Sequence, residues 1–342
     1  MAVRLKDIAE DLGVSVVTVS KVLRNHSDIS LATKQRVWKR MQELNYRPNL
    51  AARALVTGRS FAVGLVVPDL THTFFSQVAK GISQALRREA YSLVIACSEE
   101  DASLEQQEIE QLLARQVDAL IVASTQRTAD YFRSLDEREI TYVLIDRKFP
   151  DLTANFVGMD DVEVGRMATR HLIESGYRRI AHISGPNRST AYGRMHGYQM
   201  EMESHGLPVL EGYITAGKTS DDAGDASGYE AMQRLLRLER RPEAVFSFND
   251  PTCLGAMRAV FDAGLQIPKD VAMIGCGNLS YMDLLRVPLS TIDQASLSMG
   301  EHSARLALDL IESRTKLKPK TILVQPQLIQ RASTSRNDFQ AH

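Results

Sequence analysis

The residues best suited to recognition chemistry in this 342-residue chain form one outward face near its N-terminus. Helical periodicity in the stretch LKDIAEDLGVSVVTVSKVL, Leu5 to Leu23, leaves these side chains outward: Val16, Val17, Thr18, Ser20 and Lys21. Hydroxyl and ammonium groups can hydrogen-bond to phosphates and base edges, whereas valine offers apolar contact, for instance with a thymine methyl group. Such a face suits the major groove of a DNA duplex.

Two short helices around a tight turn are expected to position this face. Gly13 can end the first helix in a left-handed conformation, and Ser15 can cap the second. Val19, Val22 and Leu23 can then pack back on the first helix, as in a helix-turn-helix. A third helix is predicted from the cap at Ser30 to Leu44. The same pattern would also suit a helix pair that only packs within its own domain.

Charge favours the DNA-binding interpretation. Residues 1–60 hold 11 Lys and Arg against 5 Asp and Glu, a net charge of +6, whereas the remainder holds 30 against 37, a net charge of −7. A basic head on an acidic body indicates a polyanionic partner for the head alone. The face of the third helix with Lys34, Arg36, Lys39 and Arg40 suits either solvation or phosphate contact.

After residue 61 short apolar runs alternate with helical stretches. The first series of strands is FAVGLVV, YSLVIAC, DALIVAS and TYVLID, and the second is NFVGMD, RIAHIS, AVFSFND and DVAMIGC. This alternation predicts two doubly wound parallel-sheet lobes, with a ligand cleft where the carboxyl ends of their strands face each other. LSTIDQ, a helix at Ser296 to Ser313 and TILVQPQLIQRAS predict late segments in both lobes and several crossovers.

Other features exclude several classes of protein. No apolar run is long enough to span a bilayer and no signal peptide is evident, so a cytoplasmic protein without membrane contact is expected. Cys97, Cys253 and Cys276 are expected to be free thiols, and the eight histidines lack metal-ligand spacing, so no cofactor or metal is expected. No catalytic motif indicates an enzyme.

The order and spacing of several motifs resemble those of the lactose/galactose repressor family of bacterial transcription regulators. The motifs are the first helix pair, NYRPN, AARAL, VGLVVPDLTHTFF, FNDPTCLGAMRA, GLQIPKDVAMIG and PLSTIDQ. The resemblance implies a homodimeric, nucleoid-associated repressor that binds operator DNA and a small-molecule effector, chiefly a sugar or sugar derivative. Its fold would be an all-α helix-turn-helix head and a periplasmic-binding-protein-like α/β core.

The resemblance also implies which residues contact DNA. Val16, Val17 and Lys21 match base-reading positions, and Lys21 can donate to guanine O6 and N7. Leu55 matches the leucine that wedges into the minor groove, with Ala52 where two hinge helices meet. The other implied contacts are Ser15, Thr18, Ser20, Asn25, Thr33 and Asn49.

A second implied set binds the effector in the cleft. Phe74 and Phe75 resemble an aromatic pair that stacks on the ligand, although core packing is an alternative for both, above all for Phe75. Arg194 matches an arginine that holds the ligand. The remaining positions are Asp146, Arg147, Thr190, Asn249, Asp250 and Gln294. Gly277 stands where many members of the family have an Asp, which favours a larger or differently substituted carbohydrate, or a metabolite that needs the extra room, over an ordinary hexose.

The predicted organisation has three parts. Residues 1–46 form the head, 47–60 a linker with a short helix at Leu50 to Leu55, and 61–342 the effector-binding and dimerisation core. Lobe one takes 61–159 and 294–318, and lobe two takes 160–290 and 320–335.

Two alternative functions use other features of the chain. A solute-binding protein of a transporter would share the two lobes but has no use for a basic head. An NTP-binding enzyme would depend on Gly212 to Thr219, GYITAGKT, which matches a phosphate-loop pattern. That pattern needs a helix starting at Lys218, whereas Gly224 and Gly228 are expected to break any helix that follows.

Overall fold

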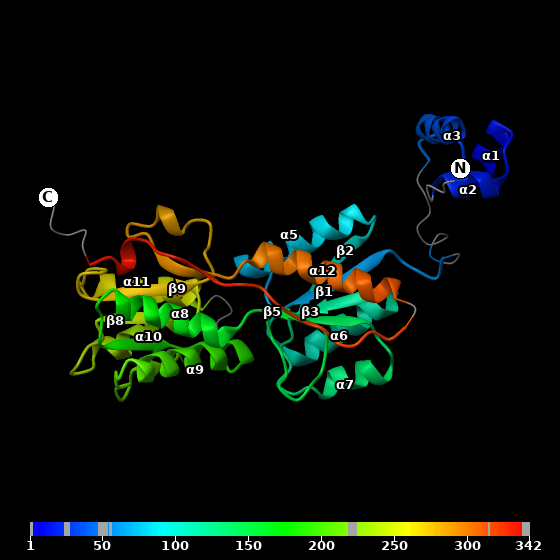
Figure 1. Cartoon of the computed structure of the whole chain (residues 1–342). Helices are drawn as coiled ribbons and strands as arrows, with labels where there is room; N and C mark the ends of the chain where they lie inside the picture. Colours follow the sequence, from blue (N-terminus) through cyan, green and yellow to red (C-terminus); the bar gives the residue numbers. More distant parts are fainter. Residues whose placement is uncertain are drawn as a thin grey trace. The chain divides into compact units, whose positions relative to one another are not determined.

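The computed structural model describes residues 3–23, 28–46, 54, 57–217, 224–313 and 315–336, and the chain forms two compact units, Met1–Ser60 and Phe61–His342 (Figure 1). Among the described residues, no helix combines the length and the apolar character needed to cross a membrane.

The first unit contains the three predicted helices, α1 (Leu5–Leu12), α2 (Val16–Leu23) and α3 (Leu31–Glu43). Gly13 takes a left-handed φ of 64° after α1, which costs a glycine little. The side-chain oxygen of Ser15 accepts a hydrogen bond from the Thr18 amide at 3.0 Å, and Ser30 caps α3 in the same way. The apolar faces meet in one core made of Ile8, Ala9, Val19, Val22, Val37 and Met41. The helix-turn-helix prediction is confirmed.

The second unit begins with an all-parallel six-stranded sheet in the order β11-β5-β4-β3-β1-β2. Its strands are β1 (Ala62–Val67), β2 (Ser92–Cys97), β3 (Ala119–Val122), β4 (Tyr142–Ile145), β5 (Phe156–Gly158) and β11 (Thr321–Leu323). Helices α5 (Thr73–Arg88) and α12 (Ser296–Glu312) share a core with one face, while α6 (Ala102–Ala114) and α7 (Asp130–Glu137) share a core with the other. Both faces are therefore buried, as apolar strands require.

A second six-stranded sheet follows the order β12-β10-β9-β8-β6-β7, parallel except that β12 runs antiparallel to β10. Its strands are β6 (Ile180–Ile183), β7 (Ile214–Thr215), β8 (Ala244–Ser247), β9 (Ala272–Cys276), β10 (Ser290–Asp293) and β12 (Gln327–Ile329). Helices α8 (Asp161–Glu174) and α9 (Ser189–Ser204) pack on one face, and α10 (Asp225–Leu236) and α11 (Asp250–Asp262) on the other. We call the two sheets with their helices lobe one and lobe two.

The chain passes between the sheets three times, after β5, after β10 and after β11. Several crossovers were predicted, but the assignment of all of residues 320–335 to lobe two is wrong. β11 pairs with β5 of the first sheet, and only β12 pairs in the second.

Glycines allow the helix pairs to approach closely. A Cβ atom on Gly228 would lie 1.9 Å from the Thr252 carbonyl oxygen of α11, and one on Gly255 would lie 1.7 Å from the Asp225 carbonyl oxygen of α10. The prediction that Gly228 breaks a helix is therefore wrong, because α10 runs through it and uses it as a packing surface. The α8–α9 and α5–α12 pairs have equivalent contacts at Gly165 with Gly197 and at Gly81 with Gly300.

Candidate functional site

On the predicted outward face of α2 the two valines are exposed, and Thr18, Ser20 and Lys21 are half-buried. Val16 and Val17 are 43% and 61% exposed, whereas Val19 and Val22 are buried in the head core. The Ser15 and Thr18 hydroxyls lie 2.9 Å apart at the start of the helix, where backbone amides also favour an anion. α2 thus presents apolar and hydroxyl groups together, although single exposed valines also occur on ordinary surfaces.

Lys21 makes an ion pair within the head. Its Nζ atom donates to Asp28 Oδ2 at 2.6 Å, and the Lys21 side chain is about one-third exposed. To donate to a base, Lys21 must exchange this carboxylate for guanine oxygen and nitrogen acceptors.

The two arginines of α3 are engaged within the head. Arg40 donates to Asp11 and to Glu43, and Arg36 donates to the Leu12 carbonyl oxygen at the end of α1. These contacts tie α3 to α1, so Arg36 and Arg40 stabilise the head fold whatever else they contact.

Several predicted residues lie outside the described part of the chain. They are Asn25, Asn49, Ala52 and Leu55 of the DNA-binding set, most of the Leu50 to Leu55 helix, and Lys218 and Thr219 of the phosphate-loop pattern. α10 begins at Asp225 and not at Lys218.

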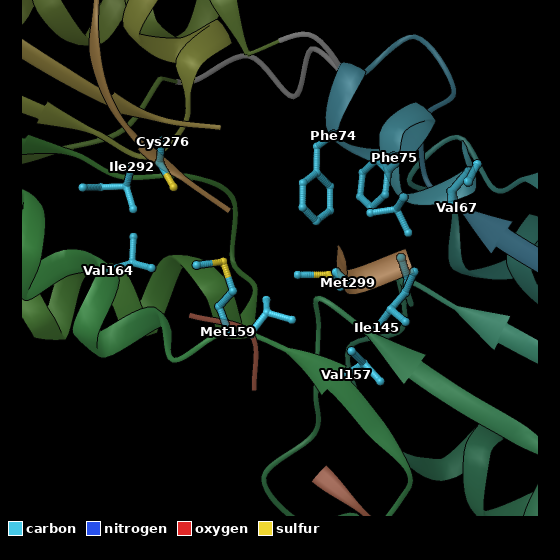
Figure 2. Packing of buried hydrophobic residues seen from close by; sticks show 14 of the residues in the cluster. Val67, Phe74, Phe75, Ile145, Val157, Met159, Val164, Cys276, Ile292 and Met299 are labelled. Atoms are coloured by element: carbon cyan, nitrogen blue, oxygen red, sulfur yellow. The ribbon is translucent and has the colours of Figure 1, made fainter. Parts of the chain in front are cut away.

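The predicted effector residues of the core follow the carboxyl ends of strands in both lobes, where open α/β sheets bind ligands. Phe74 and Phe75 begin α5 after β1, with ring centroids 5.0 Å apart in an edge-to-face arrangement. Both rings are buried in a core cluster that extends into lobe two. In Figure 2 their rings and Met299 lie on the lobe-one side, and Met159, Val164, Cys276 and Ile292 lie on the other. In this structure both rings therefore pack in the core, which was the alternative to stacking on a ligand.

A charged cluster surrounds the end of β4. Arg147 donates two hydrogen bonds to Glu100, at 2.6 and 3.1 Å, and a third to the Ser124 carbonyl oxygen. Arg188 of lobe two donates to the same Glu100 at 3.0 Å. Burial opposes ionisation of Glu100, but the two guanidinium groups hold its pKa below the ordinary value.

Hydrogen-bonding capacity is left over in this cluster. The Nε atoms of Arg147 and Arg188 are buried, and within the described ranges neither has a hydrogen-bond partner. Asp146 has a left-handed φ of 61° and a side chain that is 13% exposed, and burial raises its pKa. Its carboxylate lies 3.7 Å from Arg147 Nε, which is too far for a hydrogen bond. A ligand that both donates and accepts would complete these contacts.

Arg194, in the second turn of α9, is almost completely buried. It donates to Asp161 at 3.0 Å and to the Phe248 carbonyl oxygen at 2.8 Å, and its guanidinium lies 4.8 Å from the centroid of the Phe248 ring. Burial raises the pKa of Asp161 to about 7, although Arg194 acts in the opposite direction. No motif in the sequence indicated Asp161 or Phe248 as site residues.

Asn249 and Asp250 differ in role. Asn249 caps α11 by accepting from Thr252, and its amide nitrogen lies 3.5 Å from His72 Nε2 of lobe one. Asp250 is fully buried and accepts from Thr291 at 2.7 Å and from the Leu279 amide at 3.1 Å. Its carboxylate ties three segments of lobe two together.

Gly277 lies directly beside that carboxylate. It has a φ of 145°, and a Cβ atom added there would lie 3.1 Å from Asp250 Oδ2. A second carboxyl group at this position would approach the first, and the glycine leaves that space open. Thr190 and Gln294, the other predicted effector residues, are 3% and 5% exposed at the start of α9 and after β10.

The family models match both units of the chain. Residues 4–49 match the model for bacterial regulatory proteins of the lacI family, and residues 169–334 match a periplasmic binding protein-like domain.

Relatives and solved structures match over nearly the whole length. The HTH-type transcriptional repressor PurR of Actinobacillus pleuropneumoniae is 30% identical, over 96% of this chain and 97% of its own. The ribose operon repressor of Escherichia coli K12 is 32% identical, over 96% of this chain and 99% of its own length. The solved structure of a lac repressor dimer bound to operator has a TM-score of 0.85 at 25% identity, and the match covers 98% of this chain and 100% of that one. The structure of a CelR–cellobiose complex has a TM-score of 0.71 at 29% identity, and the match covers 97% of this chain and 99% of that one.

Proposed function

Because this chain belongs to the lacI family of bacterial regulatory proteins, we propose that it is a sequence-specific DNA-binding transcription repressor controlled by a small molecule. The effector binds between the two lobes of the core and changes the affinity of the head for its operator. The observation that carries this proposal is the extent of the match, since repressors align with the head and the core together.

The head, residues 1–46, reads the operator through α2. Lys21 donates to guanine, Val16 and Val17 contact thymine methyl groups, and the hydroxyls of Ser15, Thr18, Ser20 and Thr33 position the helix on phosphates with Asn25. The exposure of Val16 and Val17 supports this role. Residues 47–60 form the linker, in which Asn49 caps a helix that places Ala52 at the dimer axis and Leu55 in the minor groove.

The core, residues 61–342, binds a carbohydrate or a sugar derivative. The unsatisfied Nε donors of Arg147 and Arg188 and the nearby Asp146 carboxylate support this, because each sugar hydroxyl both donates and accepts. Of the effector residues predicted from the sequence, we propose that Phe74, Phe75, Asp146, Arg147, Thr190, Arg194, Asn249 and Gln294 contact the ligand and that Asp250 does not. Asp250 supports the pocket from behind, because protein donors already occupy both of its oxygens.

The repressor acts as a homodimer on the bacterial nucleoid, in the cytoplasm, and without catalysis. Its relatives are repressors, and one solved neighbour is a dimer on operator DNA. Effector-dependent closure of the lobes changes the separation of the two linker helices in the dimer, which changes the stability of the DNA-bound form.

Enrichment of duplexes from a random pool tests this proposal. We expect a pseudo-palindromic sequence whose two half-sites match the two heads of the dimer. A thermal-shift screen of carbohydrates then identifies an effector, and fluorescence anisotropy measures operator binding with and without it. Failure to enrich any duplex at low salt would contradict the proposal, and Val17→Asp provides a control that should abolish enrichment.

A further inference from the structure

We propose that Glu100 is a positioning residue that bridges the two lobes of the core and stabilises their closed arrangement. This proposal rests on the proposed function only because it assumes that the lobes open and close around an effector. Glu100 follows β2 in lobe one, and its partner Arg188 precedes α9 in lobe two.

The carboxylate is shared by two arginines from opposite lobes. Oε1 accepts from Arg147 at 2.6 Å, and Oε2 accepts from Arg147 at 3.1 Å and from Arg188 at 3.0 Å. The side chains are 28%, 11% and 15% exposed for Glu100, Arg147 and Arg188. Partial burial weakens solvent screening, so these charge-assisted bonds count for more than a surface ion pair.

The backbone supports the same role. Glu99 and Glu100 have φ values of 49° and 57°, a left-handed conformation that is unfavourable for residues other than glycine. Such a conformation costs free energy and persists where surrounding contacts over-determine it. Here the left-handed conformation occurs at Glu100 itself, whose carboxylate accepts hydrogen bonds from both guanidinium groups.

Without Glu100 the two arginines would repel each other when the lobes close. Closure would then bring two positive charges together in a partly buried place, offset only in part by the Asp146 carboxylate 3.7 Å from Arg147 Nε, and the remaining repulsion disfavours closure. With Glu100 between them, closure replaces repulsion with a hydrogen bond across the lobes. The carboxylate therefore helps to determine how far the closed state is populated before an effector binds.

Two other polar contacts among the residues that the structure describes cross between the lobes and report on closure. The Lys148 amide donates to Ser189 Oγ at 3.1 Å, and Asn249 Nδ2 lies 3.5 Å from His72 Nε2. Neither contact involves Glu100 itself, but Lys148 and Ser189 directly follow Arg147 and Arg188 in the sequence. The Arg188→Gln variant keeps both bonds between Arg147 and Glu100, so faster exchange at Lys148 in that variant reports lobe opening and not the release of Arg147.

The test is amide hydrogen exchange on the full-length, effector-free and DNA-free chain. The variants are Glu100→Gln, Arg188→Gln, the double variant, and Glu99→Gln as a matched control, because Glu99 is the exposed neighbouring carboxylate. Each single variant should speed exchange in the peptide containing Lys148 about fivefold, as expected for a partly exposed charge-assisted bond. The double variant should exchange no faster than the singles, and the control should match wild type.

Two outcomes would overturn the proposal. Unchanged exchange at Lys148 in both single variants would show that the bridge does not hold the lobes, and additive effects would show that Glu100 and Arg188 act separately. Exchange in the peptide containing α10, which packs on the opposite face of the lobe-two sheet from α9, monitors folding, and Arg188→Gln provides the test if Glu100→Gln fails to fold. Since DNA and effector are left out, this result is independent of whether the protein represses transcription.

Discussion

Replacement of Arg194 by Met tests the electrostatics of the proposed effector site. The change removes the hydrogen bonds to Asp161 and to the Phe248 carbonyl oxygen, at 3.0 and 2.8 Å, from a position where Arg194 is 3% exposed. Removing one partner of a buried pair costs about 3 to 5 kcal/mol, because the other charge is left uncompensated. Asp161 is 12% exposed and can escape part of this cost by binding a proton.

The loss should therefore depend on pH. The pKa of Asp161 is already raised by burial to about 7, above its value in the unfolded chain, so stability falls as pH rises from near 4 through that value. Without Arg194 the folded-state pKa rises further, so the fall continues above neutral pH. Relative to wild type, the variant should lose about 1.4 kcal/mol more per pH unit, or about 2 kcal/mol between about pH 7 and pH 8.5.

Urea unfolding of the full-length chain at both pH values measures this difference. The double variant with Asp161→Asn should lack the extra pH dependence, and Arg194→Met should also lose the thermal shift given by an effector. A stability loss that is equal at both pH values would refute the proposed coupling between Arg194 and Asp161.

Three further predictions concern the linker, the head and the helix packing. Leu55→Ala should weaken operator binding about tenfold or more in anisotropy titrations while leaving effector affinity unchanged. Unaltered operator binding would contradict the proposed insertion of Leu55 into the minor groove. Lys21→Gln should cost about 1 to 3 kcal/mol and relax the preference at one base pair, whereas Asp28→Asn, which frees Lys21, should tighten binding. Gly197→Ala should lower the free energy of unfolding by roughly 1 to 3 kcal/mol, because the added Cβ would lie 2.0 Å from the Val162 carbonyl oxygen. An unchanged midpoint of urea unfolding would contradict the packing argument.

Much of the fold could be predicted because its signals are local. Gly13, Ser15 and Ser30 mark helix ends in the head, and the apolar runs mark most strands of the two sheets. The two-residue strand β7 was not predicted, since Ile214 and Thr215 form no run. The sheet that β11 joins could not be deduced either, because TILVQPQLI is extended on both sides of Pro326 and its partners lie far away in sequence.

The remaining site residues depend on long-range contacts. Nothing local distinguishes Glu100 from Glu99, because the partner Arg188 lies 88 residues further along the chain. Likewise, Asp250 accepts a hydrogen bond from Thr291, which lies 41 residues further along the chain. Gly228 has the local character of a helix breaker, but the nearby Thr252 backbone requires a residue without a side chain inside α10.

Reciprocal linkage between the two ligands tests the central claim most directly. Operator affinity is measured with and without the effector, and effector affinity with and without operator, on the same full-length chain at one salt concentration. Our account predicts that the two affinity ratios agree and differ from one, roughly by a factor of 5 to 150. Ratios of one, with both ligands bound, would contradict it.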